Sequence, residues 1–178
     1  MIKPPKRHEL PEQFTWNLET VYPDDDLWEA DYQAVKQSIP RLESFRGTLG
    51  DSPDQLLACL GLRDETYKLM DRLLSYAKMR KDEDNTDSRY QGLADRAMIL
   101  AAQLSSTTAF MSPEILSIPE ERLRDFLVAR PQLAMYRHDL ERLLRLRAHV
   151  RSTEVEMVLA QATEVARTPQ NTFGMLNN

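Results

Sequence analysis

His8 and Glu9 lie in the stretch RHELPEQFTW and match the first two residues of a zinc-binding pattern. That pattern, His-Glu-x-x-His on a helix, places two imidazoles one turn apart so that both bind the same metal ion. Here Glu12 stands at the position of the second histidine, and Pro11 would remove a backbone donor from the helix. The stretch therefore lacks both a ligand and the helical geometry that such a site requires.

The other histidines and the densest acidic run do not complete a metal site either. His138 and His149 would share a helical face only on an unbroken helix, and a metal would still need two further ligands. A calcium-binding loop counted from Asp82 has Asp87 and Leu93 at the positions that require glycine and glutamate. We therefore predict solvated or helix-terminal histidines, a connector with capping carboxylates, and no metal ligand in this chain.

Nucleophilic and phosphate-binding chemistry also lack a suitable arrangement. Cys59, the single cysteine, lies in the apolar run LLACLGL, with no basic residue close in sequence to activate its thiol. We predict that it packs in the core as a small hydrophobe. The five glycines are scattered singly, so the sequence has no glycine-rich phosphate loop. No catalytic residue is predicted.

Arginines between residues 137 and 151 carry the main functional ambiguity of the sequence. Leucines lie between these cations, so the segment predicts an amphipathic helix with the arginines Arg137, Arg142, Arg145, Arg147 and Arg151. One interpretation is a solvated face. A second is that Arg137, Arg142, Arg145 and Arg147 contact carboxylates of another domain or of a peptide C-terminus. Nucleic-acid binding is a third and less favoured interpretation, because the net charge is −5 and the segment lacks aromatic residues for stacking.

The composition is that of a soluble globular protein. The 178 residues are 42% hydrophobic and 29% charged, enough for one domain with a sizeable core. A net charge of −5 does not indicate a nucleic-acid or membrane partner. The single cysteine excludes an intrachain disulfide, and the first residues lack the apolar run of a secretory signal. No apolar run approaches the ~20 residues that cross a bilayer, so we expect a cytoplasmic protein.

Helical periodicity recurs along the chain, whereas no stretch has the alternation typical of strands. The predicted helices span about 25–45, 52–80, 87–110, 119–130 and 133–144. Pro40 is expected to kink or split the first helix. Ser52 and Pro53 are a typical helix start. Two further helices are expected to begin at Thr153 and Thr168.

We therefore predict an all-α fold, a multi-helix bundle of about six or seven helices. Residues 1–23 are expected to form an extended N-terminal segment, and residues 24–167 the helical domain. Residues 168–178 hold only the start of a truncated helix that would lead to an absent domain.

Several stretches occur in a fixed order along nearly the whole chain. None is a mechanistic motif alone, but together they are specific enough to indicate a resemblance to a known family. They are ELPEQFTWNLETVY with Trp28, YAKMRKDEDNT, YQGLADRA, PEILSIPEERL, RHDLERLLRLRAHVRSTEVE and TPQNTFGMLNN. Together they resemble the N-terminal part of the oligoendopeptidase F family of zinc metallopeptidases. In that family a helical N-terminal domain forms part of the wall of a deep channel that admits short peptides. The zinc ligands lie in a downstream catalytic domain, in a His-Glu-x-x-His motif.

The resemblance implies a role without catalytic groups for this chain. No position matches the family's zinc ligands or catalytic glutamate, so the isolated chain is expected to hold no zinc and to be inactive. Its expected partners are the C-terminal catalytic domain of the parent protein and oligopeptide substrates. As a fragment, the chain is expected either to fray at its C-terminus or to form a homodimer. The open alternative is a non-enzymatic helical binding or scaffold protein of the same ancestry.

Overall fold

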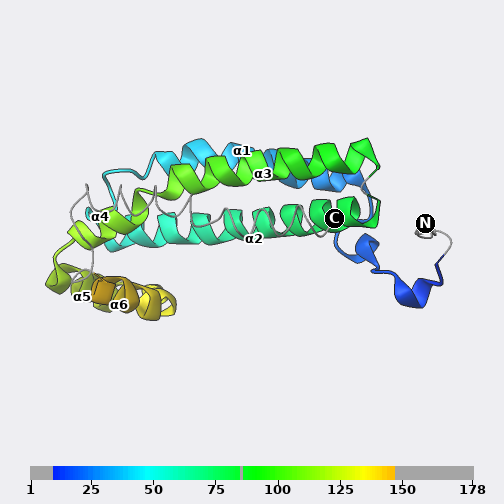
Figure 1. Cartoon of the computed structure of the whole chain (residues 1–178). Helices are drawn as coiled ribbons and strands as arrows, with labels where there is room; N and C mark the ends of the chain where they lie inside the picture. Colours follow the sequence, from blue (N-terminus) through cyan, green and yellow to red (C-terminus); the bar gives the residue numbers. More distant parts are fainter. Residues whose placement is uncertain (1–9, 85, 147–178) are drawn as a thin grey trace. The chain divides into compact units, whose positions relative to one another are not determined.

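The computed structural model describes residues 10–84 and 86–146. Within them every regular element is helical, with α-helices α1 to α6 and the short 3-10 helices η2, η3 and η4 (Figure 1). The predicted all-α class is confirmed for this part of the chain. The chain divides into two compact units, residues 1–134 and 135–178, which are described separately. The predicted domain boundaries near residues 23 and 167 stay predictions.

Helix α1 spans Asp25–Glu43. Its N-terminus is capped by Asp24, whose carboxylate accepts a hydrogen bond from the Leu27 backbone N–H at 2.8 Å. The predicted apolar face is confirmed, with buried positions Trp28, Val35, Ile39 and Leu42. The helix continues through Pro40 and is not split there. Pro40 lies in the last turn of α1 and lacks the N–H that would bond to the carbonyl of the preceding turn, and the helix ends three residues later.

Helix α2 spans Pro53–Glu83, and its predicted start is confirmed. The Ser52 hydroxyl accepts a hydrogen bond from the Gln55 backbone N–H at 3.2 Å, and Pro53 occupies the first helical position. The helix extends beyond the expected end near Arg80, since the Arg80 guanidinium pairs with Glu83 at 3.2 Å one turn later. The basic residues of this last turn also complement the helix dipole.

Helix α3 spans Ser88–Thr108, and Asp87 caps it by accepting the Arg89 backbone N–H at 2.8 Å. Its buried face carries Leu93, Ala94, Ala97, Leu100 and Leu104. The small residues on this face allow the close approach of a neighbouring helix. Helices α1, α2 and α3 lie side by side and contact one another in pairs (Figure 1). They form the core of the first unit.

Two shorter helices follow α3. The third helix was expected to continue to about Phe110. Helix α3 instead ends at Thr108, and α4 spans Met111–Ser117 and α5 Glu120–Ala129. The Glu114 carboxylate of α4 accepts hydrogen bonds from the backbone N–H groups of Gly47 and Leu49, each at 2.8 Å. Gly47 has φ +84°, a left-handed conformation that favours glycine. The carboxylate thus holds the turn after α1 against α4.

The segment before α1 folds onto α2. It contains η2 (Glu12–Phe14) and η3 (Leu18–Thr20), and Leu18 and Tyr22 are buried. An Arg72 guanidinium N–H donates to the Val21 carbonyl oxygen at 2.9 Å, and an Arg80 N–H donates to the Glu19 carboxylate at 2.8 Å. Two cations of α2 therefore fix a segment that precedes them by 51 and 61 residues.

In the second unit, α6 spans Arg137–Leu146, directly after η4 (Pro131–Tyr136). Tyr136 and Leu140 are buried, as the predicted apolar face requires. The helices expected to start at Thr153 and Thr168 lie outside the described residues. In the part of the chain that the structure describes, no helix has the length and apolar character to span a membrane.

Candidate functional site

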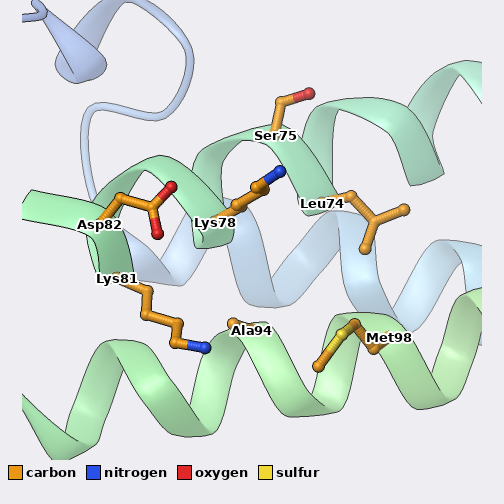
Figure 2. A pocket seen from close by; sticks show the side chains of 7 residues that line it. All are labelled: Leu74, Ser75, Lys78, Lys81, Asp82, Ala94 and Met98. Carbon is orange, nitrogen blue, oxygen red and sulfur yellow. The ribbon is translucent and has the colours of Figure 1, made fainter. Parts of the chain in front are cut away.

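A groove lies between α2 and α3 in the first unit (Figure 2), with a cavity volume of about 450 Å³. Such a volume is within the range of small-ligand sites, ~300–1,000 Å³. Its walls come from both helices and consist of Leu74, Ser75, Lys78, Lys81, Asp82, Ala94 and Met98. We call this cavity the α2–α3 groove.

The α2–α3 groove combines an apolar surface with two ammonium groups. Leu74 from one helix and Ala94 and Met98 from the other supply apolar atoms, and Met98 is 54% exposed. Lys78 and Lys81 lie one turn apart on α2, and both side chains line the groove. In Figure 2 the Lys81 side chain extends toward Ala94 of α3. The groove can therefore accept a ligand that joins an apolar group to a negative charge.

None of the predicted arginines that the structure describes lines this groove. Arg137, Arg142 and Arg145 lie exposed on α6, in the second unit, and Arg147 lies outside the described residues, as does Arg151. Arg142 comes within 3.9 Å of Asp139, and both side chains are more than half exposed. Exposed pairs of this kind contribute at most ~1 kcal/mol. A contact of the predicted arginines with another domain or a peptide stays a prediction.

The acidic connector between α2 and α3 carries capping carboxylates, as predicted. Asp87 caps α3, and the Asp84 carboxylate accepts the Thr86 backbone N–H at 2.9 Å. Among residues 10–84 and 86–146, no group of three or more His, Cys, Asp or Glu side chains could hold a metal ion. The described residues therefore do not supply the ligand set of a zinc site.

Cys59 is fully buried on α2, which confirms its predicted place in the core. Burial raises the pKa of its thiol to about 11, and the charge of Arg63 opposes this shift more weakly. A thiol with this pKa is neutral at physiological pH and is a poor nucleophile.

We expect the Cys59 thiol to react with a disulfide reagent at about pH 8 at least ~100-fold more slowly in the native chain than in denaturant, because reaction requires opening of the fold. The unfolded thiol ionises near its ordinary pKa of 9.0 and the folded thiol near 11. Its contribution to stability is therefore present below pH 9 and lost as the pH rises toward 11. The reagent releases a thione when it reacts with the thiol, and the absorbance of this thione measures the reaction rate in native buffer and in denaturant. Equal rates in native buffer and denaturant would contradict the buried position.

Sequence reasoning missed the α2–α3 groove. Its residues are spread over two helices, and the periodicity of each helix does not tell which faces meet. One signal was present, because Met98 and Ile99 fall outside the buried stripe of α3 and are 54% and 68% exposed. Two adjacent exposed apolar residues on a helix can indicate a contact surface.

Comparisons with known proteins agree with this architecture. A family model described as oligopeptidase F matches residues 114–178. Oligopeptidase PepF of Bacillus subtilis is 42% identical over 174 residues, which cover 98% of this chain and 26% of that protein. Group B oligopeptidase PepB of Streptococcus agalactiae is 33% identical over 97% of this chain and 29% of its own length.

Solved structures share the fold. The oligoendopeptidase-F from Enterococcus faecium superposes with a TM-score of 0.70 at 29% sequence identity, over 87% of this chain and 31% of that chain. A putative peptidase from Chlamydophila abortus superposes with a TM-score of 0.75 at 24% identity, which shows the fold alone.

The helical fold and these similarities define the class, which is the N-terminal domain of a peptidase. The chain belongs to the oligoendopeptidase F family. It spans only about a quarter to a third of the length of the relatives that it matches.

Proposed function

We propose that this chain is the N-terminal domain of a zinc-dependent oligoendopeptidase and forms part of the wall of a channel that admits short peptides. The observation that carries the proposal is the 42% identity to oligopeptidase PepF of Bacillus subtilis over 98% of this chain. In such an enzyme a bound zinc ion supplies an activated water for peptide hydrolysis. The described residues do not form a zinc site, so the proposal assigns binding and exclusion to them and assigns the chemistry to another part of the protein.

The proposed role requires packed helices with an accessible cavity beside them, and two features of the first unit support it. Helices α2 and α3, of 31 and 21 residues, pack along each other with buried leucines and alanines. The α2–α3 groove opens beside them and carries apolar and cationic groups. We further propose a cytoplasmic location, which a single buried thiol and the absence of any possible intrachain disulfide support.

A chimera tests the proposal. This chain replaces the homologous region of oligopeptidase PepF of Bacillus subtilis, and hydrolysis of a quenched-fluorescence peptide is compared with that of the parent and of a variant lacking the region. We expect the chimera to retain activity and the deletion to lose at least ~100-fold, because productive orientation of the substrate contributes factors of this size. A fully active deletion variant would contradict the proposal.

The isolated chain provides the complementary prediction. After dialysis against a weak chelator it should retain well under one zinc per chain and cleave no peptide, because the described residues supply no ligand set. Elemental analysis and the same peptide assay are the measurements. One retained zinc ion per chain, with turnover that is lost on replacing His138 or His149, would place the catalytic groups in this chain and contradict the account.

A further inference from the structure

We propose that the α2–α3 groove binds the C-terminal carboxylate of an oligopeptide whose last side chain is apolar. The choice of a peptide as the ligand rests on the proposed function, whereas the preference for a carboxylate next to an apolar group rests on the groove itself. The proposal therefore names a subsite for one end of the substrate, on residues that no sequence motif indicated.

Lys78 and Lys81 place two ammonium groups at the α2–α3 groove. Several arginines of the first unit are paired, such as Arg80 with Glu19 at 2.8 Å and Arg96 with Glu29 at 2.7 Å. Neither groove lysine forms an ion pair with another residue of the described part of the chain. Two unpaired ammonium groups, with three donors each, lie at one cavity and favour an anionic ligand.

Asp82 limits which anion fits. Its carboxylate lines the same groove and lies one turn beyond Lys78 on α2. A ligand with a second negative charge close to the first would meet this carboxylate, since like charges at short distance are unfavourable. The groove therefore favours a single carboxylate over a phosphate or over a peptide that ends in an acidic residue.

The apolar wall defines the rest of the ligand. Leu74, Ala94 and Met98 meet the cavity from both helices, as the side chains in Figure 2 show. Methionine is unbranched and flexible, so Met98 can adapt to side chains of different shape. Burial of an apolar side chain contributes to binding at ~25 cal/mol per Å² before the cost of association. We therefore expect a preference for a large apolar residue at the end of the peptide, without strict selection among such residues.

Binding of a fluorescein-labelled tetrapeptide, Gly-Gly-Ala-Phe, to the full chain tests the proposal by fluorescence anisotropy. The peptide acid should bind saturably, and the otherwise identical C-terminal amide should bind about 10-fold more weakly. The double variant Lys78→Gln with Lys81→Gln should lose a similar factor. The matched control is Lys68→Gln, an exposed lysine of α2 that does not line the groove, and its affinity should be unchanged. Raising the salt concentration should weaken binding of the acid alone.

A second measurement locates the ligand. In a chain labelled at the methionine methyl groups, the Met98 resonance is identified by its loss in the variant Met98→Leu. It should shift on addition of the peptide acid and shift markedly less with the amide at the same concentration. Unlabelled laurate serves as a competitor, because a fatty acid presents the same carboxylate and apolar chemistry. If the peptide acid binds as expected and laurate displaces it, the result agrees with the proposal.

Three results would overturn the proposal: equal affinities for the acid and the amide, equal affinities for the double variant and the Lys68→Gln control, or binding of laurate alone. None of these results changes the outcome expected for the chimera, which measures hydrolysis. Conversely, an active deletion variant together with normal peptide binding would contradict the proposed function and leave the carboxylate site in place. The two failures are therefore distinguishable.

Discussion

Replacing Trp28 with alanine is expected to lower the free energy of unfolding by about 3–5 kcal/mol. The Trp28 side chain is fully buried in α1, and its indole Nε1 donates a hydrogen bond to the Leu73 carbonyl oxygen of α2 at 3.1 Å. The indole stacks on the Tyr32 ring with centroids 5.3 Å apart, and the Arg96 guanidinium of α3 lies 5.3 Å from it. One side chain thus contacts all three long helices, and its removal leaves a cavity between them.

Urea denaturation followed by circular dichroism measures this loss. Leu27→Ala is the matched control, because Leu27 is the neighbouring residue of the same helix and its side chain is 50% exposed. The control should change the free energy of unfolding by at most ~0.5 kcal/mol. If Trp28→Ala also costs less than ~1 kcal/mol, the packing of α1 on α2 and α3 is wrong.

Replacing Tyr22 with alanine is expected to destabilise the chain by about 3–5 kcal/mol and to release the segment before α1. The Tyr22 side chain is 1% exposed, and its ring meets the Tyr76 ring edge-on with centroids 5.2 Å apart. The Arg72 guanidinium lies 4.7 Å from the same ring. These contacts fix the end of the segment to α2, so residues 10–22 should become more susceptible to limited proteolysis. Mass spectrometry of the cleavage products is the measurement.

The variant Tyr22→Phe separates the ring from its hydroxyl group. The hydroxyl donates a hydrogen bond to the Asp31 carboxylate at 2.7 Å, and burial together with this carboxylate raises the pKa of Tyr22. The phenol therefore stays protonated and keeps donating across the usual pH range. Loss of this bond should cost about 1.5–3 kcal/mol, as expected for a charged acceptor, without release of the segment. If the phenylalanine variant is cleaved as fast as the alanine variant, the aromatic contact does not hold the segment.

The helical elements were predictable where local chemistry determines them. Ser52 and Pro53 started α2 as expected, because a capping hydroxyl and a proline at the first position act within one turn. The carboxylate expected to cap the third helix was found at Asp87. The split that was one of the two expectations for Pro40 does not occur, because helix α1 continues to Glu43, whereas the kink stays a prediction. The end of α2 was placed too early. The Arg80–Glu83 pair lies in the last turn of the helix, in a run of charged residues that is typical of a connector.

The stretches that carried the family resemblance turn out to meet in space. Tyr22 ends the first of them and Asp25 lies three residues further on, and Tyr76 and Arg80 belong to the second. The Tyr76 hydroxyl donates to Asp25 at 3.1 Å, and Tyr22 packs on Tyr76. The Arg80 guanidinium lies 5.7 Å from the ring of Tyr90, which begins the third stretch. This cluster joins the segment before α1 to α2 and α3, so these residues contribute to the packing of the fold.

The candidate site was less predictable than the fold. The sequence assigned no role to Lys78 and Lys81, which lie in the stretch YAKMRKDEDNT, because the role of a charge on a helix surface depends on the element that packs opposite. The pairing of α2 with α3 brings Ala94 and Met98 beside them, and periodicity within one helix carries no information on that pairing. The arginines of α6 were the more conspicuous pattern in sequence, yet those that the structure describes lie exposed, in a different unit from the groove.

The native polypeptide from the source cells provides the most direct test of the central claim, that this chain is the N-terminal domain of a zinc-dependent oligoendopeptidase. An antibody raised against this chain isolates the protein, and its intact mass, zinc content and hydrolysis of a quenched-fluorescence peptide are measured on one sample. The account predicts a polypeptide several times longer than 178 residues, with a His-Glu-x-x-His motif beyond Asn178, bound zinc and peptidase activity that a chelator removes. A native polypeptide that ends at Asn178, holds no zinc and cleaves no peptide would contradict it and favour a helical binding or scaffold protein.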